Sequence, residues 1–102
     1  MISDKYTEEE LNDLSDFFKV FAETSRLKIL FLLEEGECCV NCIAEQCGMS
    51  QSAVSQQLKI LRASRLVRYR KNGRNISYRL SDDHISRILN LGREHYEELL
   101  NL

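Results

Sequence analysis

Two short helical segments meet at Gly48, and this junction constrains the fold more than any other part of the sequence. The first segment covers about residues 39–47, and the second begins with a capping serine and covers about residues 50–64. Ala44 stands where two such helices pack closely, the glycine stands in the turn, and Val54 stands where the second helix needs a buried side chain. This spacing predicts a helix-turn-helix unit.

Three further helices are expected along the chain. Thr7 and Glu10 have the spacing of a capping box, and apolar side chains follow at helical intervals up to residue 21. Residues 24–34 are apolar on almost every side and stop before Gly36, which predicts a central core helix. A last helix is expected from residue 82 or 83 to residue 99.

A β-hairpin is expected between the fourth and fifth helices, because apolar and basic side chains alternate there. The Asn-Gly pair at residues 72–73 is the preferred centre of a type I′ turn. A turn centred on this pair sets Tyr69 opposite Ile76. It also sets Val67 opposite Tyr78, so that apolar pairs align on one face of the hairpin.

These elements predict a protein that is mainly α with a small β-hairpin. We expect a winged helix-turn-helix of about five helices plus a two-stranded wing, forming one domain over residues 1–102. A chain of this size folds with little stability to spare, so a dimer would be a natural supplement. The longest apolar run, residues 27–33, is far shorter than the roughly 20 residues of a membrane span, and the amino terminus is acidic. We therefore expect a cytoplasmic protein with no membrane partner.

The charge of the chain is divided unevenly, although the net charge is only −2. Eight of the 14 Lys and Arg residues lie between residues 50 and 80, where there is no acidic residue, and all 16 acidic residues lie elsewhere. A basic segment inside an acidic protein is a candidate surface for a polyanion such as DNA. A solvated basic face is the alternative interpretation.

The second helix of the helix-turn-helix unit is predicted to have an apolar inner face and a polar outer face. At about 100° per residue, Val54, Leu58 and Leu61 point inward together. The opposite face lacks the acidic residues that ordinary surface helices use for pairing, so we favour contact with double-stranded operator DNA. The candidate DNA contacts are Gln51, Ser52, Ser55, Gln56, Lys59 and Arg62 on this helix and, for phosphates, Arg68, Arg70, Lys71 and Arg74 on the hairpin.

Two other classes of function fit the sequence less well. A winged helix can bind proteins without DNA, but that function does not explain the basic segment. A redox enzyme that uses the Cys-x-x-Cys pair of Cys39 and Cys42 would need a βαβ context, and the predicted elements do not supply one. No phosphate-binding glycine loop, Ser/His/Asp set or catalytic carboxylate pair stands out, so we expect neither an enzyme nor a small-molecule substrate.

Several segments resemble the ArsR/SmtB family of bacterial winged-helix repressors. They are residues 37–40, 48–61 and 66–67, together with Asn72, Gly73 and Arg74. The resemblance implies a homodimer, with dimerisation helices at both ends of the chain, that represses its own operon. It also implies release from DNA when a metal ion binds or a thiol-modifying effector reacts.

The last predicted helix holds a candidate metal site. His84 and His95 share one face but stand roughly 16 Å apart along the axis, too far for one ion to bridge within a chain. An antiparallel copy of the helix from a second protomer would bring them together and form two sites per dimer. The spacing is similar to the site of the family's zinc sensors, which implies Zn(II) as effector, with Co(II) as a plausible surrogate. The four candidate ligands are Asp82, His84, His95 and Glu98.

Four cysteines within ten residues form a second candidate site. Soft-metal sensors of the family resemble this region but carry Cys-Val-Cys-Asp, so Cys39 matches the first ligand and Asn41 replaces the second. Three alternatives stay open: a three-thiolate site of Cys38, Cys39 and Cys42 for an ion such as Cd, Pb or As, a Cys39–Cys42 dithiol that senses oxidants or reactive sulfur, and packing thiols. Cys47 is expected to belong to the core.

Overall fold

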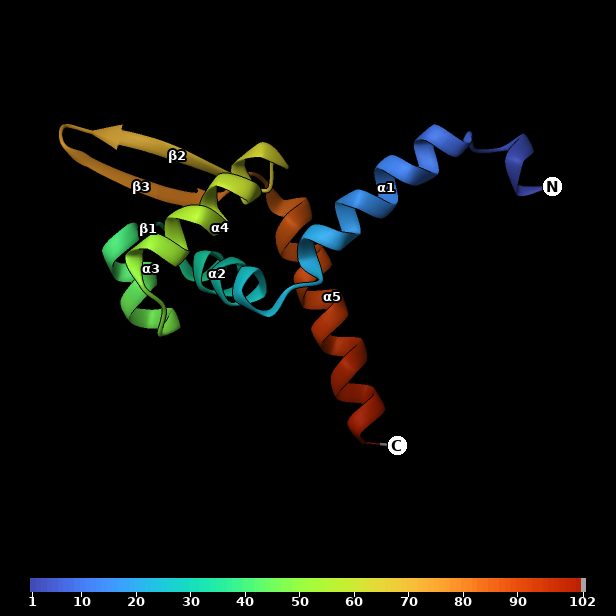
Figure 1. Ribbon diagram of the computed structural model, residues 1–102. Coiled ribbons are helices and arrows are strands. Elements are labelled where there is room, and N and C mark those ends of the chain that lie inside the picture. Colours follow the sequence, from blue (N-terminus) through green and yellow to red (C-terminus); the bar gives the residue numbers. More distant parts are fainter. Residues whose placement is uncertain (102) are drawn as a thin grey trace.

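The computed structural model describes residues 1–101 and confirms the mainly α architecture with five helices (Figure 1). It adds two elements that the sequence did not predict, a short 3-10 helix at the amino terminus and a third strand. The elements in order are η1 (Ile2–Asp4), α1 (Glu8–Phe21), α2 (Thr24–Glu35), β1 (Cys38–Cys39), α3 (Val40–Cys47), α4 (Gln51–Ala63), β2 (Val67–Asn72), β3 (Asn75–Leu80) and α5 (Asp83–Leu100).

The helix ends lie where the capping residues place them. The Thr7 hydroxyl accepts a hydrogen bond from the backbone N–H of Glu10 at 3.0 Å, and the Glu10 carboxylate accepts one from the Thr7 N–H at 3.4 Å. Gly48 ends α3 with φ +65°, a left-handed conformation that favours glycine. The Ser50 hydroxyl then accepts from the Ala53 N–H at 3.0 Å and starts α4. The predicted helix-turn-helix unit is thereby confirmed.

The hydrophobic core lies around α2, which is central as predicted. Ile29 and Leu30 on α2 have no exposed surface. Side chains from α3, α4, β2 and α5 close around them, so the core joins the helix-turn-helix unit to the base of the wing. The most deeply buried of these other side chains are Ile43, Val54, Leu58 and Leu61, and Leu66, just before β2, is equally buried.

The three strands form an antiparallel sheet in the order β1-β3-β2. The predicted hairpin register was wrong by two residues: Tyr69 lies opposite Tyr78, and Val67 lies opposite Leu80. The turn is centred one residue later than expected, and its first central residue is Gly73 with φ +67°, the only central residue with positive φ. That is the sign pattern of a type II′ turn. Because the shift is even, every side chain stays on its predicted face.

The third strand, β1, was missed because it has only two residues, too few to produce an alternating pattern. Cys38 pairs with Tyr78 of β3, and Cys39 pairs with Ser77. Neighbouring residues of a strand point to opposite faces. Cys38 therefore packs against the core, whereas Cys39 is exposed on the outer face of the sheet.

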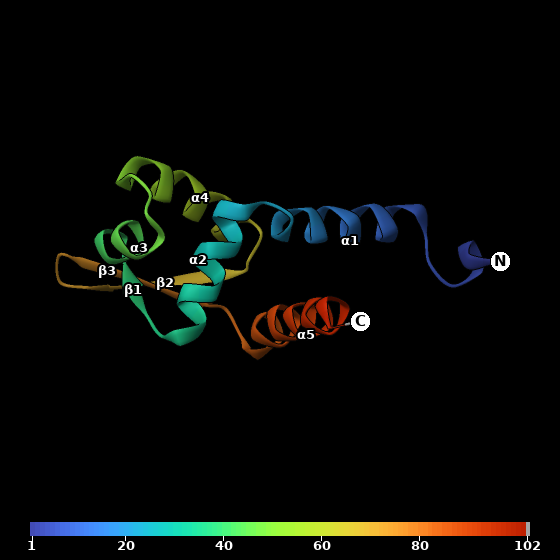
Figure 2. The same ribbon diagram turned by 90° about the horizontal axis from the view of Figure 1, so that it is seen from below.

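Helices α1 and α5 extend away from the body of the molecule, as Figure 2 shows. The radius of gyration is 15.6 Å, above the roughly 13 Å of a compact domain of this length. Apolar side chains are exposed on both helices: Leu14 and Phe18 keep 50% and 53% of their surface, and Leu91 and Leu99 keep 67% and 54%. Among the described residues, no helix is both long enough and apolar enough to cross a membrane.

Candidate DNA-binding interface and effector sites

The outer face of α4 presents the predicted reading side chains to solvent. Val54, Leu58 and Leu61 are buried on the inner face, as predicted, and they fix the rotation of the helix about its axis. This rotation leaves a polar and basic stripe that no acidic side chain of α4 interrupts. The exposed residues of the stripe are Gln51, Ser52, Ser55, Gln56, Lys59 and Arg62.

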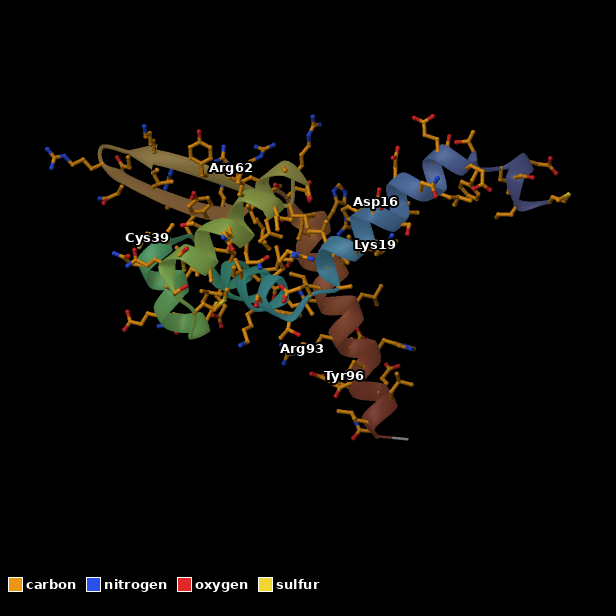
Figure 3. All side chains as sticks on the ribbon, viewed as in Figure 1. Asp16, Lys19, Cys39, Arg62, Arg93 and Tyr96 are labelled. Atoms are coloured by element: carbon orange, nitrogen blue, oxygen red, sulfur yellow. The ribbon has the colours of Figure 1, made fainter. Side chains whose placement is uncertain are left out.

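The wing is basic and exposed, but one of its arginines already has a partner. Arg70 Nη2 lies 2.7 Å from Glu37 Oε2, a contact between residues 33 positions apart that the sequence did not predict. Arg62 lies at the wing-side end of α4 (Figure 3). Its guanidinium carbon is 4.0 Å from the centroid of the Tyr69 ring. Arg68, Lys71 and Arg74 are exposed along β2 and at the turn.

At the start of α5, the structure brings Asp82 and His84 together. Asp82 caps the helix, accepting hydrogen bonds from the backbone N–H groups of His84 at 2.9 Å and Ile85 at 3.4 Å. Its carboxylate oxygen also lies 3.4 Å from His84 Nδ1. Desolvation acts to raise the pKa of Asp82, but these hydrogen bonds and the neighbouring histidine outweigh it and lower that pKa.

The other two candidate ligands, His95 and Glu98, lie farther along α5 and are exposed. Within residues 1–101 of one chain, no three His, Cys, Asp or Glu side chains gather closely enough to hold a metal ion. Each end of α5 carries one carboxylate and one imidazole: Asp82 and His84 at the start, and Glu98 and His95 near the other end. Carboxylate and imidazole are donors that zinc sites use. Within the described residues of one protomer, these two pairs do not come together.

The sulfur atom beside Cys42 is that of Cys38, not that of Cys39, its partner in the Cys-x-x-Cys motif. Cys42 Sγ lies 3.8 Å from Cys38 Sγ, while Cys39 is on the opposite face of β1. Burial raises the pKa of the Cys38 thiol to about 11, with a further contribution from Cys42. Burial also raises the pKa of Cys47, which packs partly against the core. All four cysteines are free thiols.

Comparisons with known proteins agree with this architecture. A family model described as "Bacterial regulatory protein, arsR family" matches residues 23–69. The chain is 39% identical to a protein named "Transcriptional repressor SmtB homolog" from Synechocystis sp., over 88% of this chain and 68% of that protein.

Two solved structures share the fold over most of its length. The first is the homodimeric winged helix-turn-helix DNA-binding domain of a possible ArsR-family regulator from Mycobacterium bovis, with TM-score 0.82 and 32% identity, covering 88% of this chain and 83% of that one. The second is the AntR antimony-specific transcriptional repressor, with TM-score 0.82 and 37% identity, covering 94% of this chain and 87% of that one.

Fold and interface together define a winged helix-turn-helix transcriptional regulator. The helix-turn-helix unit, the basic wing and the similarity to an SmtB homologue over nearly the whole chain all point to the same group. The chain belongs to the arsR family of bacterial regulatory proteins.

Proposed function

We propose that this protein is a transcriptional repressor that binds operator DNA as a homodimer and is released when Zn(II) binds between the subunits. Operator DNA and a second copy of the chain are its partners, as for other winged helix-turn-helix regulators of this family. The observation that carries the zinc proposal is the position of the Asp82 carboxylate beside the His84 imidazole, 3.4 Å apart and both exposed at the start of α5.

The DNA contacts follow from the exposed face of α4 and from the wing. In a helix-turn-helix, the amino-terminal part of the second helix enters the major groove. Gln51, Ser52, Ser55 and Gln56 lie in that part of α4, and their amides and hydroxyls can read base edges. Lys59, Arg62 and the wing cations then contact phosphates, which add affinity without sequence preference.

The subunit interface follows from the exposed apolar surface of the end helices. His84 lines a shallow surface pocket together with Ile88 and Leu91, so the first zinc ligands lie beside an apolar stripe of α5. An antiparallel α5 from the partner would cover this stripe and place its own His95 and Glu98 next to Asp82 and His84. Each dimer then holds two Zn(II) sites with nitrogen and oxygen ligands, which Co(II) can also occupy.

Zinc would act through the relative position of the two reading helices. A metal ion that joins both copies of α5 fixes the geometry of the dimer, whereas the reading helices must match half-sites about 34–36 Å apart. If the zinc-bound geometry fits DNA less well, zinc and DNA weaken each other's binding by the same factor, with a coupling free energy of about 1–3 kcal/mol.

The test compares variants of the two candidate effector sites. His95→Asn should abolish zinc-driven release while leaving the DNA affinity of the metal-free protein nearly unchanged. Cys39→Ser and Cys42→Ser should still be released from DNA by zinc. The wild-type dimer with alkylated thiols should still bind two zinc ions. Loss of release in the cysteine variants and its retention in His95→Asn would assign sensing to the thiols.

A thiol-based sensor is the second candidate function. The 3.8 Å separation of Cys38 Sγ and Cys42 Sγ favours it, and AntR, one of the similar structures, is described as antimony-specific. In this alternative, Cys39 and Cys42, with Cys38, respond to a soft ion such as Cd, Pb or As, or to reactive sulfur or an oxidant. The same variants therefore decide between the two proposals.

A further inference from the structure

A cavity of about 500 Å³ lies between the carboxyl end of α4 and the base of the wing. Three arginines, Arg62, Arg65 and Arg68, line it together with a single carboxylate, that of Asp82. The positive charges exceed the negative charge, so the cavity favours an anion. Arg65 is not among the DNA contacts that the helical pattern predicts, because it lies beyond the end of α4.

Arg65 adopts a backbone conformation that arginine disfavours. Its φ is +61°, and it is the only non-glycine residue with positive φ among residues 1–101. The N–H of Leu66 donates to the carbonyl of Leu61 at 2.9 Å, and the N–H of Arg65 donates to that of Arg62 at 3.0 Å. These two bonds form a Schellman motif, in which glycine is the usual residue at the position that Arg65 occupies. A strained residue of this kind, at the edge of a charged cavity, suggests a function for its side chain.

The three guanidinium groups are available for a ligand. In the described part of the chain, none of them takes part in a side-chain hydrogen bond or ion pair, whereas Arg70 and Arg93 each contact a carboxylate. Arg62 is held against the Tyr69 ring, with its guanidinium carbon 4.0 Å from the ring centroid. This stacking leaves the edge of the guanidinium group, with its N–H donors, free to bind two oxygens of a phosphate.

The position of the cavity relates it to DNA. Arg62 is both the last side chain of the exposed α4 stripe and part of the cavity wall. With 13 residues, α4 is roughly 20 Å long, and the major groove is about 12 Å wide. When the amino-terminal half of α4 reads bases, its carboxyl end therefore reaches the phosphates at the rim of the groove.

We propose that this cavity receives a backbone phosphate of the bound duplex and that Arg65 contacts it, held in place by the turn that ends α4. The inference rests on the proposed DNA-binding function and adds a contact to it. Because a backbone phosphate carries no sequence information, this contact contributes equally to operator and unrelated DNA. The conformational strain at Arg65 is then a loss of stability that the protein retains for binding.

Arg65→Gly separates these two effects. Glycine relieves the strain, so the variant should unfold at a Tm about 4 °C higher than the wild type. Its affinity for a duplex from the protein's own promoter should fall about ten-fold, and by the same factor for an unrelated duplex. The slope of log affinity against log salt should decrease by about two, one phosphate for each subunit. Fluorescence anisotropy at several salt concentrations measures the slope.

Matched variants isolate the charge. Arg65→Lys should keep most of the salt slope, Arg65→Asn should lose it without a strained side chain, and Lys5→Gln, far from the cavity, should change neither. An Arg65→Gly protein that is stabilised but binds both duplexes like the wild type would overturn the inference. The inference would also be wrong if inorganic phosphate stabilised the wild type and not Arg65→Gly, while the two proteins bound DNA with equal affinity. A wild type that binds no duplex would overturn the proposed function as well.

Discussion

Arg70 of the wing and Glu37, the residue before β1, form an ion pair with an N–O distance of 2.7 Å. Cys39, Ser77 and Arg70 lie side by side across the three strands. The Glu37–Arg70 pair therefore lies at the outer face of the sheet, where the chain enters the helix-turn-helix unit. In the proposed DNA complex, Glu37 would compete with phosphates for the Arg70 guanidinium. Arg70 keeps 61% of its side-chain surface, and a pair of this kind near the surface contributes only about 0–1 kcal/mol to stability, so phosphates could displace Glu37.

Glu37→Gln should strengthen DNA binding. The substitution removes the competing carboxylate and leaves Arg70 free, so the affinity should rise a few-fold at low salt and the salt dependence should become steeper. Arg70→Ala should have the opposite effect, and the double variant should behave like Arg70→Ala alone. Anisotropy titrations of the four proteins give this cycle, and an affinity increase that persists without Arg70 would contradict it.

The wing and the reading helix should differ in the kind of affinity that they supply. Arg74→Ala at the hairpin turn should weaken binding to every duplex alike and reduce the salt slope by about one for each subunit. Gln56→Ala on α4 should mainly reduce the preference for the operator over unrelated DNA. Competition binding with both duplexes measures the preference, and an equal loss of specificity in the two variants would refute the assignment.

Asp82 should be separable into a helix cap and a metal ligand. Asn is as good a cap as Asp, so Asp82→Asn should keep the thermal stability but weaken zinc binding. Asp82→Ala should lose both. Because the pKa of Asp82 is lowered in the folded protein, its carboxylate contributes stability above its unfolded pKa, and this contribution is lost as the pH falls through the folded value. Thermal melts across acidic pH should show this loss in the wild type but not in Asp82→Asn.

The cysteines should react in an order set by burial. The exposed Cys39 should be alkylated by iodoacetamide before Cys38, whose pKa of about 11 leaves little thiolate near neutral pH. Since the folded pKa of Cys38 is raised from 9.0, its contribution to stability is present below about pH 9 and is lost as the pH rises through about 11. Mass spectrometry of peptides after timed alkylation gives the order, and faster labelling of Cys38 would contradict it.

The α5 surface should be needed for assembly rather than for the fold of one subunit. Leu91 is 67% exposed, so Leu91→Glu should leave the helix content unchanged but shift the protein from dimer to monomer. Loss of the dimer should lower operator affinity strongly, because the two half-sites would no longer be bound together. Analytical ultracentrifugation and circular dichroism test the two parts, and Asn90→Gln, an exposed position of the same helix outside the pocket that His84 and Leu91 line, provides a control.

Local signals predicted most of the fold. Capping residues such as Thr7 and Ser50, together with helical spacing, located all five helices to within about two residues, because these signals act within one turn. The hairpin was predicted but its register was not, since the sequence does not show whether Gly73 is the first or second central residue of the turn.

Features that depend on the folded chain were the part that the sequence did not reveal. The proximity of Cys38 to Cys42 depends on β1 pairing with β3, which turns Cys38 inward and Cys39 outward. The Glu37–Arg70 pair and the αL conformation of Arg65 likewise require the folded chain. The candidate zinc ligands Asp82, His84, His95 and Glu98 remain predictions, because the described residues of one chain do not bring them together and the proposed site needs a second subunit.

The two-residue strand β1 connects the wing directly to the helix-turn-helix unit. Cys39 ends β1 and is also the cap residue before α3, so no free linker separates the sheet from the first helix of the unit. A rotation of the wing is therefore transmitted through the backbone pairing of Cys38 and Cys39 to α3, and from α3 to α4. In the proposed DNA complex, a misfit at the wing tip would therefore also displace the reading helix.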